Sequence, residues 1–330
     1  QIDNGSNDAC GIASMSVSPN TFDVNNVGDN NVTLTVNDNN GNSSICTAVV
    51  TVQDDGAPTA LCQDITVYLD GAGTVGILAT DVDNGSNDPS GIDTMIVTPN
   101  TFGCVNVGGN IVTLDVTDNN GNSAQCTATV TVFDTIPPTA FCQNITVQLD
   151  AGGNASITAN DVDGSSNDAC GIASTSAAPN TFTCSNVGSN NAVLTVNDNN
   201  GNSSNCNVNV EVEDNVDPIA LCQDITIQLD AAGNASITAN DVDGGSNDAC
   251  GIASTSVAPN AFTCANVGSN NVVLTVNDNN GNSSNCNANV EVEDNVDPTA
   301  ICQDITVQLG AAGNASIIAN DVDGGSTDAC

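Results

Sequence analysis

The chain repeats itself every 80 residues, and this period constrains its fold more than any other feature. Two series of equivalent residues mark the period: Cys62, Cys142, Cys222 and Cys302, and Asp81, Asp161, Asp241 and Asp321. A fixed period of this length indicates an array of equivalent structural units. A unit of this size is a small domain whose own core is marginal for stability.

The charge of the chain has one sign only. It contains 39 Asp and Glu residues and no Lys, Arg or His, which gives a formal net charge of −39. Nucleic-acid binding needs basic side chains that displace counterions, so that function class is excluded. No apolar run of about 18 residues occurs, so no membrane insertion is predicted. The charge must be balanced from solution, and we expect metal ions to take that role.

The cysteine content predicts how such small units are stabilised. Aromatic residues make up only 2% of the chain, so the core must consist of Val, Ile, Leu and Ala with single phenylalanines such as Phe182 and Phe262, whereas 15 cysteines are available as cross-links. This density is typical of an oxidising, extracellular location. Zinc and iron–sulfur sites are not predicted, because no C-x-x-C spacing occurs.

Proline-containing acidic segments indicate the boundaries of the units. Pro58, Pro138, Pro218 and Pro298 each follow such a segment, where proline is typical of a linker or strand entry. Cutting there predicts complete repeats at 57–136, 137–216 and 217–296, the C-terminal part of a repeat at 1–56, and the N-terminal part of another at 297–330. We expect the chain to be part of a longer array.

Within one unit, apolar and polar residues alternate over short segments between turns. In the 217–296 repeat this pattern predicts strands at 225–229, 235–239, 252–257, 272–276 and 286–293. Residues 230–234 are expected to form a hairpin turn between the first two strands, and the Asn-Gly pair at 280–281 predicts another hairpin. No segment carries helical periodicity. The sequence therefore predicts an all-β fold, a tandem array of disulfide-linked immunoglobulin-like β-sandwiches.

The same segments carry a family resemblance. DTIPP at 134–138, with Cys142 and ITV at 145–147, resembles the opening of a hyalin-type (HYR) repeat, and residues 187–214, with the DNNGN turn and the following cysteine, resemble its close. The Asn/Asp/Gly-rich composition resembles tandem repeats of large Bacteroidetes surface proteins exported by type IX secretion and used in adhesion and gliding. The resemblance implies an extracellular β-sandwich array and no enzymatic activity.

Four cysteines in a full repeat allow three connectivities. Ser90 stands at the second cysteine position of its repeat and Val24 at the third position of the preceding one, while first and fourth positions keep their cysteines. This favours first-to-fourth bridges and second-to-third bridges: Cys62–Cys126, Cys142–Cys206, Cys222–Cys286, Cys170–Cys184 and Cys250–Cys264. Cys10 and Cys104 are then unpaired within their repeats, either as buried or oxidised thiols or as partners of another unit or chain.

The direction of the predicted strands brings three acidic segments to each repeat junction: the linker, the long loop after the second strand, and the turn before the last strand. Calcium prefers six to eight oxygen ligands of this kind, so we expect calcium sites there. The candidate ligands are Asp81, Asp83, Asp88, Asp118, Asp161, Asp163, Asp168, Asp198, Asp214, Asp217, Asp241, Asp243, Asp248, Asp278, Asp294 and Asp297. The loop spacing departs from an EF-hand, which needs a terminal Glu and flanking helices. The alternative is that Asp, Asn and Gly form ordinary turns on a soluble surface.

The sequence favours a structural function, a stalk or filament segment of a long extracellular protein stiffened by calcium. Two alternatives remain: a calcium-dependent module that binds glycans or surfaces, and a subunit that polymerises with copies of itself by strand exchange. The partners predicted are neighbouring repeats, and in the alternatives surface glycans or further copies. No enzyme is predicted, because no nucleophile has a basic partner. Thr94 and Thr135 follow Asp in a pattern that resembles Bacteroidetes O-glycosylation sites.

Overall fold

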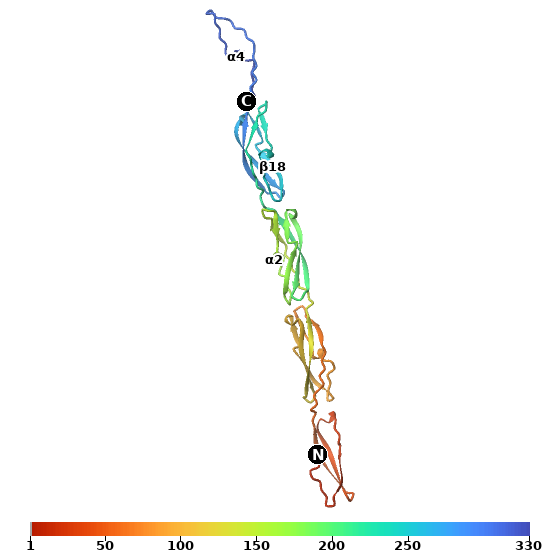
Figure 1. The fold of residues 1–330 in the computed structure, drawn as a ribbon. Coiled ribbons are helices and arrows are strands. Elements are labelled where there is room, and N and C mark those ends of the chain that lie inside the picture. The colour runs from red at the N-terminus through yellow and green to blue at the C-terminus, as the bar shows by residue number, and fades with distance from the viewer. Residues whose placement is uncertain (1) are drawn as a thin grey trace. The chain divides into compact units, whose positions relative to one another are not determined.

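A computed structural model describes residues 2–330, and its elements recur with the period of the sequence (Figure 1). Residues 1–56 contain β1 (Ile12–Ser18), the 3-10 helix η1 (Val24–Asn26), β2 (Gly28–Asp38) and β3 (Ser43–Val52). The 57–136 repeat contains β4 (Ile65–Tyr68), β5 (Thr74–Gly76), α1 (Ala79–Val82), β6 (Ile92–Thr98), β7 (Thr101–Gly103), η2 (Cys104–Asn106), β8 (Gly108–Asp118) and β9 (Ser123–Phe133).

The next two repeats contain the same elements in the same order. In 137–216 these are β10 (Ile145–Gln148), β11 (Asn154–Ser156), α2 (Ala159–Val162), β12 (Ile172–Ala178), β13 (Thr181–Thr183), η3 (Cys184–Asn186), β14 (Gly188–Asp198) and β15 (Ser203–Glu213). In 217–296 they are β16 (Ile225–Gln228), β17 (Asn234–Ser236), α3 (Ala239–Val242), β18 (Ile252–Ala258), β19 (Ala261–Thr263), η4 (Cys264–Asn266), β20 (Gly268–Asp278) and β21 (Ser283–Glu293).

Each fully described sandwich has a four-stranded and a two-stranded sheet. In the 217–296 repeat the larger sheet has the order β16-β21-β20-β18, and β17 pairs with β19 in the smaller one. β16 runs parallel to β21, whereas β21 and β18 both run antiparallel to β20. The 57–136 repeat has the equivalent sheets β4-β9-β8-β6 and β5-β7. The predicted all-β, immunoglobulin-like tandem fold is therefore confirmed.

Strict alternation along the long strands builds the core. In β20 the side chains of Val272, Leu274 and Val276 are fully buried, and the two-residue period then turns the last residue, Asp278, to the same side. The sheets close over Phe262, which is 1% exposed and lies in a cluster with these residues. A carboxylate thus ends a row of core positions, which places it at the edge of the interior.

Three details differ from the sequence-based expectation. The first two strands do not form a hairpin, because β16 pairs with β21 and β17 pairs with β19, so the turn at 230–234 connects two different sheets. The strand predicted at 235–239 ends earlier, at Ser236, and a single helical turn, α3, begins at Ala239. β19 and η4 were not predicted, since three-residue elements leave no periodic pattern. The α-helices have four residues each, and no helix of the described part of the chain is long and apolar enough to cross a membrane.

The partial repeats at the two ends carry fewer elements. Residues 1–56 form one three-stranded sheet, β1-β2-β3. The described residues of 297–330 contain no strand, only α4 (Ala319–Val322) and isolated bridges such as Thr299 with Thr327 (Figure 1).

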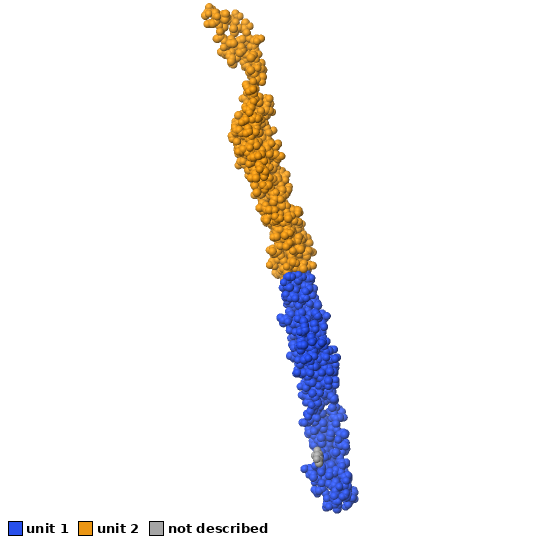
Figure 2. Space-filling view, viewed as in Figure 1, with its two compact units in different colours: residues 1–139, 167–174, 196–204 blue, residues 140–166, 175–195, 205–330 orange. Residues whose placement is uncertain are grey.

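Two compact units are distinguished, and the longest segment of the first ends at Thr139, directly after Pro138 of a linker (Figure 2). One contains residues 1–139, 167–174 and 196–204, and the other contains 140–166, 175–195 and 205–330. The segments 167–174 and 196–204 thus group with residues of the preceding repeat, to which they are linked as described below. The repeat boundaries at 57, 137, 217 and 297 therefore stay predictions.

The row of core positions in β20 gives the first prediction. Leu274→Ala removes a fully buried side chain and should lower the free energy of unfolding of its repeat by ~2–5 kcal/mol. The matched control is Val273→Ala on the same strand, whose side chain is 37% exposed and whose loss should cost less than about 1 kcal/mol. Urea unfolding followed by circular dichroism measures both. Equal losses would contradict the inward assignment of Leu274.

Candidate metal centre

Three acidic segments meet at each junction between described repeats, as the strand directions predict. We number the junctions by the repeats they join: the first joins 1–56 to 57–136, the second joins 57–136 to 137–216, and the third joins 137–216 to 217–296. Potential ligand atoms lie within 4.8 Å of one another in three clusters: Asp54, Asp88 and Asp118; Asp134, Asp168 and Cys170; Asp214, Asp248 and Cys250. Cys170 and Cys250 are in disulfides, so the carboxylates are the relevant donors there.

The linker aspartate is the most unusual member of the cluster. Asp134 and Asp214 are 7% and 6% exposed. Their Oδ1 atoms accept hydrogen bonds from the N–H groups of Ile136 and Val216, each at 3.1 Å. The Oδ2 atom of each is buried and has no hydrogen-bond partner in the described residues. Burying a carboxylate oxygen without a partner is costly, so a cation or a hydrogen-bond donor beside this atom would stabilise it.

The long loop supplies the second carboxylate. Asp168 and Asp248 each accept a hydrogen bond from the N–H two residues later, that of Cys170 or Cys250, at 2.7 Å. This short turn fixes the loop and leaves the second carboxylate oxygen available. At the first junction Asp88 accepts the equivalent bond from Ser90 N, also at 2.7 Å.

The turn before the last strand adds a carboxylate to the cluster at the first junction, Asp118, whereas Asp198 and Asp278 lie outside the clusters found among the described residues. Asp278 accepts hydrogen bonds from Asn280 N, Gly281 N and Asn282 N, at 2.7–2.9 Å. Asn282 Nδ2 donates both to Asp278 Oδ2, at 2.7 Å, and to the carbonyl oxygen of Asp214, at 3.1 Å, which ties the turn to the linker. Asn280 Oδ1 is buried and unpartnered, as is Asn200 Oδ1 in the equivalent turn. Each of these turns therefore carries an amide oxygen that is buried without a partner among the described residues.

These hydrogen bonds set the ionisation of the turn aspartates. Burial alone would raise the pKa of Asp278, but the amides of Asn282, Asn280 and Gly281 outweigh it and hold the pKa below its ordinary value. The pKa values of Asp118 and Asp198 are lowered for the same reasons. The carboxylates therefore stay charged at neutral pH.

Five of the predicted ligands, Asp88, Asp118, Asp168, Asp214 and Asp248, lie in clusters of the described residues, and the others lie outside these clusters. Three of the others, Asp81, Asp161 and Asp241, accept N–H bonds from the residue before their short helix. Three more, Asp83, Asp163 and Asp243, accept bonds from the serine three residues later. Asp217 and Asp297 are exposed, and neither they nor Asp294 belong to a cluster of the described residues. Aspartates of the same loop thus accept hydrogen bonds from different groups. The acidic composition of the loop does not show which aspartate faces which group.

The disulfides confirm one half of the predicted connectivity and correct the other. Within repeats the structure has Cys62–Cys126, Cys142–Cys206 and Cys222–Cys286. The predicted pairs Cys170–Cys184 and Cys250–Cys264 are wrong, and Cys104 is not unpaired. The bridges instead join the third cysteine of one repeat to the second of the next: Cys104–Cys170, Cys184–Cys250 and Cys264–Cys330. Cys10, Cys46 and Cys302 are exposed and form no disulfide within the described residues.

Strand direction explains why the second and third cysteines of one repeat do not form a bridge with each other. Cys250 precedes β18, and Cys264 follows β19. Because β17 and β20 both run toward the linker end, their antiparallel partners β19 and β18 both run away from it. About ten strand residues therefore separate the two cysteines by roughly 30 Å, far beyond the reach of a disulfide.

A signal for this pairing was present in the sequence. Val24 and Ser90, the two positions without cysteine, are the third position of one repeat and the second position of the next. They are thus the two halves of a single missing bridge at the first junction. If one bridge across a junction is absent, both of its cysteines are expected to be absent together. The two positions therefore indicate the observed pairing between repeats.

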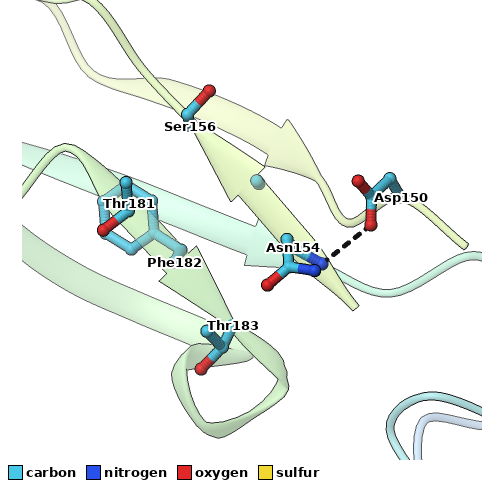
Figure 3. Close-up of a pocket in the computed structure, with 7 residues that line it drawn as sticks. Asp150, Asn154, Ser156, Thr181, Phe182 and Thr183 are labelled. Carbon is cyan, nitrogen blue, oxygen red and sulfur yellow. Dashed lines mark hydrogen bonds between the residues drawn. The ribbon is translucent and has the colours of Figure 1, made fainter. Parts of the chain in front are cut away.

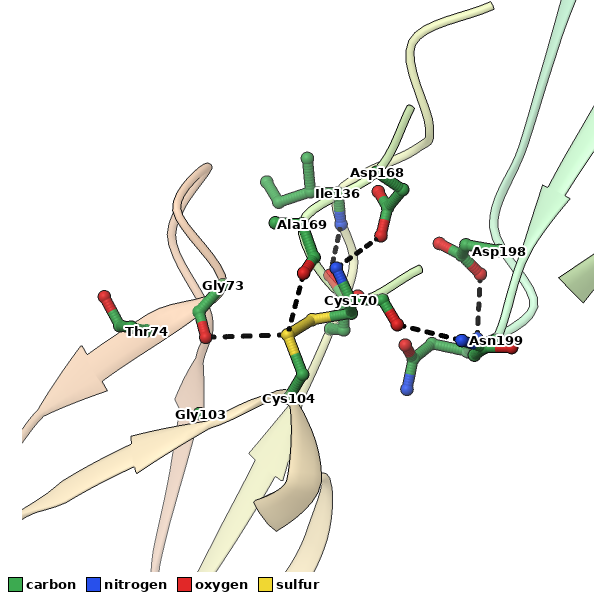
Figure 4. Close-up of a disulfide and its surroundings, with 12 residues drawn as sticks. Gly73, Thr74, Gly103, Cys104, Ile136, Asp168, Ala169, Cys170, Asp198 and Asn199 are labelled. Carbon is green, nitrogen blue, oxygen red and sulfur yellow. Dashed lines mark hydrogen bonds between the residues drawn. A yellow bond between two sulfur atoms is a disulfide. The ribbon is translucent and has the colours of Figure 1, made fainter. Parts of the chain in front are cut away.

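The bridge forms at a closely packed contact (Figure 4). Cys104 Sγ lies 3.7 Å from the carbonyl oxygen of Gly73 and 3.5 Å from that of Ala169. These are packing contacts, since a bridged sulfur carries no hydrogen. Gly73 has a φ of +74°, and a Cβ at this position would lie 2.7 Å from Cys104 Sγ and 3.2 Å from Ala169 Cβ. Gly153 and Gly233 occupy the equivalent position at the next two bridges.

A shallow pocket elsewhere offers little chemistry. It lies between β11 and β13 and is lined by Asp150, Asn154, Ser156 and the segment 181–183, among others (Figure 3). Asp150 Oδ1 accepts hydrogen bonds from Gly152 N and Asn154 N, both at 2.9 Å, so this carboxylate holds the turn. Thr94 and Thr135, the predicted O-glycosylation sites, are exposed, and their modification stays a prediction.

Comparisons with known proteins add little. No family model and no curated protein matches the chain. Among solved structures, it resembles protocadherin gamma B7 extracellular cadherin domains 1–4 (12% identity, 80% of this chain and 83% of that one, TM-score 0.30). Two others are sidekick-1 immunoglobulin domains 1–5 (9%, 83% and 68%, 0.31) and Drosophila N-cadherin EC1–4 (10%, 82% and 86%, 0.28). These scores carry no argument about function.

The glycine at the bridge gives the second prediction. Gly73→Ala should lower the free energy of unfolding of the 57–136 repeat by more than about 1 kcal/mol, because alanine meets both a positive φ and the bridge sulfur. The control is Gly71→Ala in the same turn, where a Cβ meets nothing within 4 Å and a neutral or slightly stabilising effect is expected. Calorimetry measures stability, and thiol titration reports whether Cys104 is still bridged. Equal behaviour of the two variants would refute the close contact.

The lowered pKa of Asp278 gives the third prediction. Its folded pKa lies below the unfolded value, so its charge stabilises the fold above about pH 4 and loses this effect as the pH falls through the folded pKa. Asp278→Asn should therefore unfold at lower urea concentration than the parent at pH 7, and the gap should narrow below about pH 4. Urea midpoints from pH 2 to pH 7 in EDTA test this. A gap independent of pH would show that the charge of Asp278 does not stabilise the turn.

Proposed function

We propose that this chain is a segment of an extracellular stalk or filament whose repeat junctions bind calcium. It is supported by a tandem β-sandwich array in which one set of disulfides closes each complete repeat and a second set ties it to its neighbour. Bridges of the second kind limit the movement of successive repeats, as expected of a load-bearing element. Disulfides at this density favour an oxidising location outside the cell.

The observation that carries the calcium proposal is the buried, unpartnered Oδ2 atom of Asp134 and Asp214. Each lies in a cluster with a second carboxylate, Asp168 or Asp248. The chain has no basic side chain that could balance them. Hard divalent cations prefer carboxylate and amide oxygens, and calcium accepts irregular sets of them. Asn200 and Asn280 offer the amide oxygens.

At the third junction an ion held by this set would join three separate segments. Asp214 belongs to the linker, Asp248 to the long loop and Asn280 to the turn between β20 and β21. Bound calcium would supply positive charge where these segments otherwise repel one another. The residues themselves orient the oxygens through their backbone hydrogen bonds. Loss of the ion is therefore expected to loosen the linker relative to the repeat that follows it.

The finer identity of the protein is part of this proposal. The HYR-like segments support membership in the surface repeat proteins of Bacteroidetes, with type IX export. No enzymatic role is proposed. Neighbouring repeats are the partners the bridges support, whereas association with surface glycans or with copies of the chain in a fibre stays a prediction of the sequence.

The fourth prediction tests the ion. Calcium should raise the melting temperature, with a stabilisation of about 2.7 kcal/mol at a hundredfold excess over its Kd, and EDTA should reverse it. Asp214→Ser keeps an acceptor for Val216 N but removes the buried charge. It should abolish the calcium effect on the 217–296 repeat and leave stability in EDTA unchanged or higher. The control is Asp217→Ser, which alters an exposed carboxylate of the same linker.

Calorimetry and small-angle scattering measure the outcome. An identical melting curve and scattering profile in calcium and in EDTA would contradict the proposal. Retention of the wild-type chain on an immobilised glycan only in calcium would favour the adhesive alternative over the stalk.

A further inference from the structure

The bridge between repeats and the proposed ion site share one short loop. At the second junction, Cys170 forms the bridge to Cys104, and its backbone N–H donates to Asp168 Oδ1 at 2.7 Å (Figure 4). Asp168 lies in the cluster with Asp134. The third junction repeats the arrangement with Cys250 and Asp248. A covalent tie from the preceding repeat therefore ends two residues from a candidate ligand.

The same loop also contacts the turn that carries the open amide oxygen. Asn199 Nδ2 donates to the carbonyl oxygen of Cys170 at 2.9 Å, and Asn199 N donates to that of Gly171 at 3.2 Å. The next residue is Asn200, whose Oδ1 is buried and unpartnered. The position of Cys170 thus determines where Asp168 lies and supports the turn that carries Asn200.

The preceding repeat holds the loop from the other side. Gly73 allows the sulfur of Cys104 and the methyl group of Ala169 to approach its Cα closely. Without the bridge, the loop would keep its internal hydrogen bonds but lose its attachment to this surface. Ligands that are held in place before binding lose less conformational entropy when the ion binds.

We infer that the disulfide between repeats is a positioning element of the junction's ion site, so that bridge formation and calcium binding strengthen each other. The inference rests on the proposed calcium function. By reciprocity, opening the bridge weakens calcium binding by the same factor by which calcium disfavours opening the bridge. Cys170 and Cys250 are not ligands in this arrangement, because their sulfurs are bonded to Cys104 and Cys184.

The first junction serves as a natural comparison. Ser90 and Val24 take the repeat positions of the bridge, and three carboxylates, Asp54, Asp88 and Asp118, lie in the cluster of this junction. Ser90 Oγ donates to Asp88 Oδ1 at 2.5 Å, so a hydroxyl supports the carboxylate from its own loop. An ion at this junction would be independent of any bridge.

The experiment is a redox titration of the full chain with and without calcium. A dithiol such as dithiothreitol gives two electrons and two protons to each disulfide and is itself oxidised to its cyclic disulfide. After equilibration the free thiols are alkylated, and the chain is cleaved at acidic residues, because it has no Lys or Arg. Mass spectrometry then gives the reduced fraction of each bridge.

We expect calcium to lower the reduction potential of Cys104–Cys170 and Cys184–Cys250 by about 30 mV for a tenfold coupling. Cys62–Cys126 and Cys142–Cys206 are the internal controls, since they lie within repeats and outside this loop. A second measurement is calorimetric titration of calcium into the pair of substitutions Cys104→Ser and Cys170→Ser. The calcium affinity of one junction should fall about tenfold, whereas the pair Cys142→Ser and Cys206→Ser should leave the calcium affinities unchanged.

The outcomes separate the two proposals. If the oxidised wild-type chain binds no calcium, the proposed function fails and the inference fails with it. If calcium binds and raises the melting temperature, but all bridges keep their potentials and the Cys104→Ser, Cys170→Ser chain keeps its affinities, the inference alone is overturned. Equal shifts of all four bridges would also overturn it, because they would report general stabilisation.

Discussion

The structure depends above all on hydrogen bonds that aspartates accept from backbone N–H groups in their own turns. A chain with 39 acidic residues and no basic ones cannot form ion pairs between its side chains. Asp150, Asp163 and Asp278 show the common solution, in which a carboxylate accepts amides from the next two to four residues. Such charge-assisted bonds are strong, and they fix the loops in shape. Most carboxylates are satisfied locally in this way, which makes the open oxygens of Asp134 and Asp214 exceptional.

Strand direction then decides what each end of a repeat contributes. Because β18 and β19 run the same way, the second and third cysteines lie at opposite ends of the sandwich, and the last strand carries the chain on to the next linker. A repeat therefore offers a linker aspartate and a cysteine to its successor, and a loop and a turn to its predecessor. Neither the bridge nor the carboxylate cluster is complete within one repeat. The topology of the sandwich therefore brings the bridge between repeats and the carboxylate cluster to the same loop.

The strands and the acidic junctions were predictable from the sequence. The disulfide pairing and the choice of ligands were not, because both depend on which groups face each other in space. Alternation and turn residues predicted the long strands, and the strand directions brought Asp214, Asp248 and Asp278 to one end. Periodicity, however, does not tell whether two positions pair within a period or across it, which is why Cys250 was assigned to Cys264 instead of Cys184. The absence of cysteine at both Val24 and Ser90 contains that information, but only when the two positions are recognised as partners in one bridge. Composition likewise could not separate ligand candidates from aspartates that hold turns, since that depends on which amides each one faces.

The first junction differs from the others in a way that bears on mechanics. The second and third junctions combine a covalent tie with two clustered carboxylates, whereas the first has three carboxylates, Asp54, Asp88 and Asp118, and no bridge. A disulfide resists separation whatever the ion concentration, but a junction held by an ion alone follows that concentration. Three like charges without a cation also repel more strongly than two. With calcium bound as proposed, we therefore expect compliance in the array to concentrate where Ser90 replaces cysteine, because the stiffness of that junction would depend on the ion and not on a covalent tie.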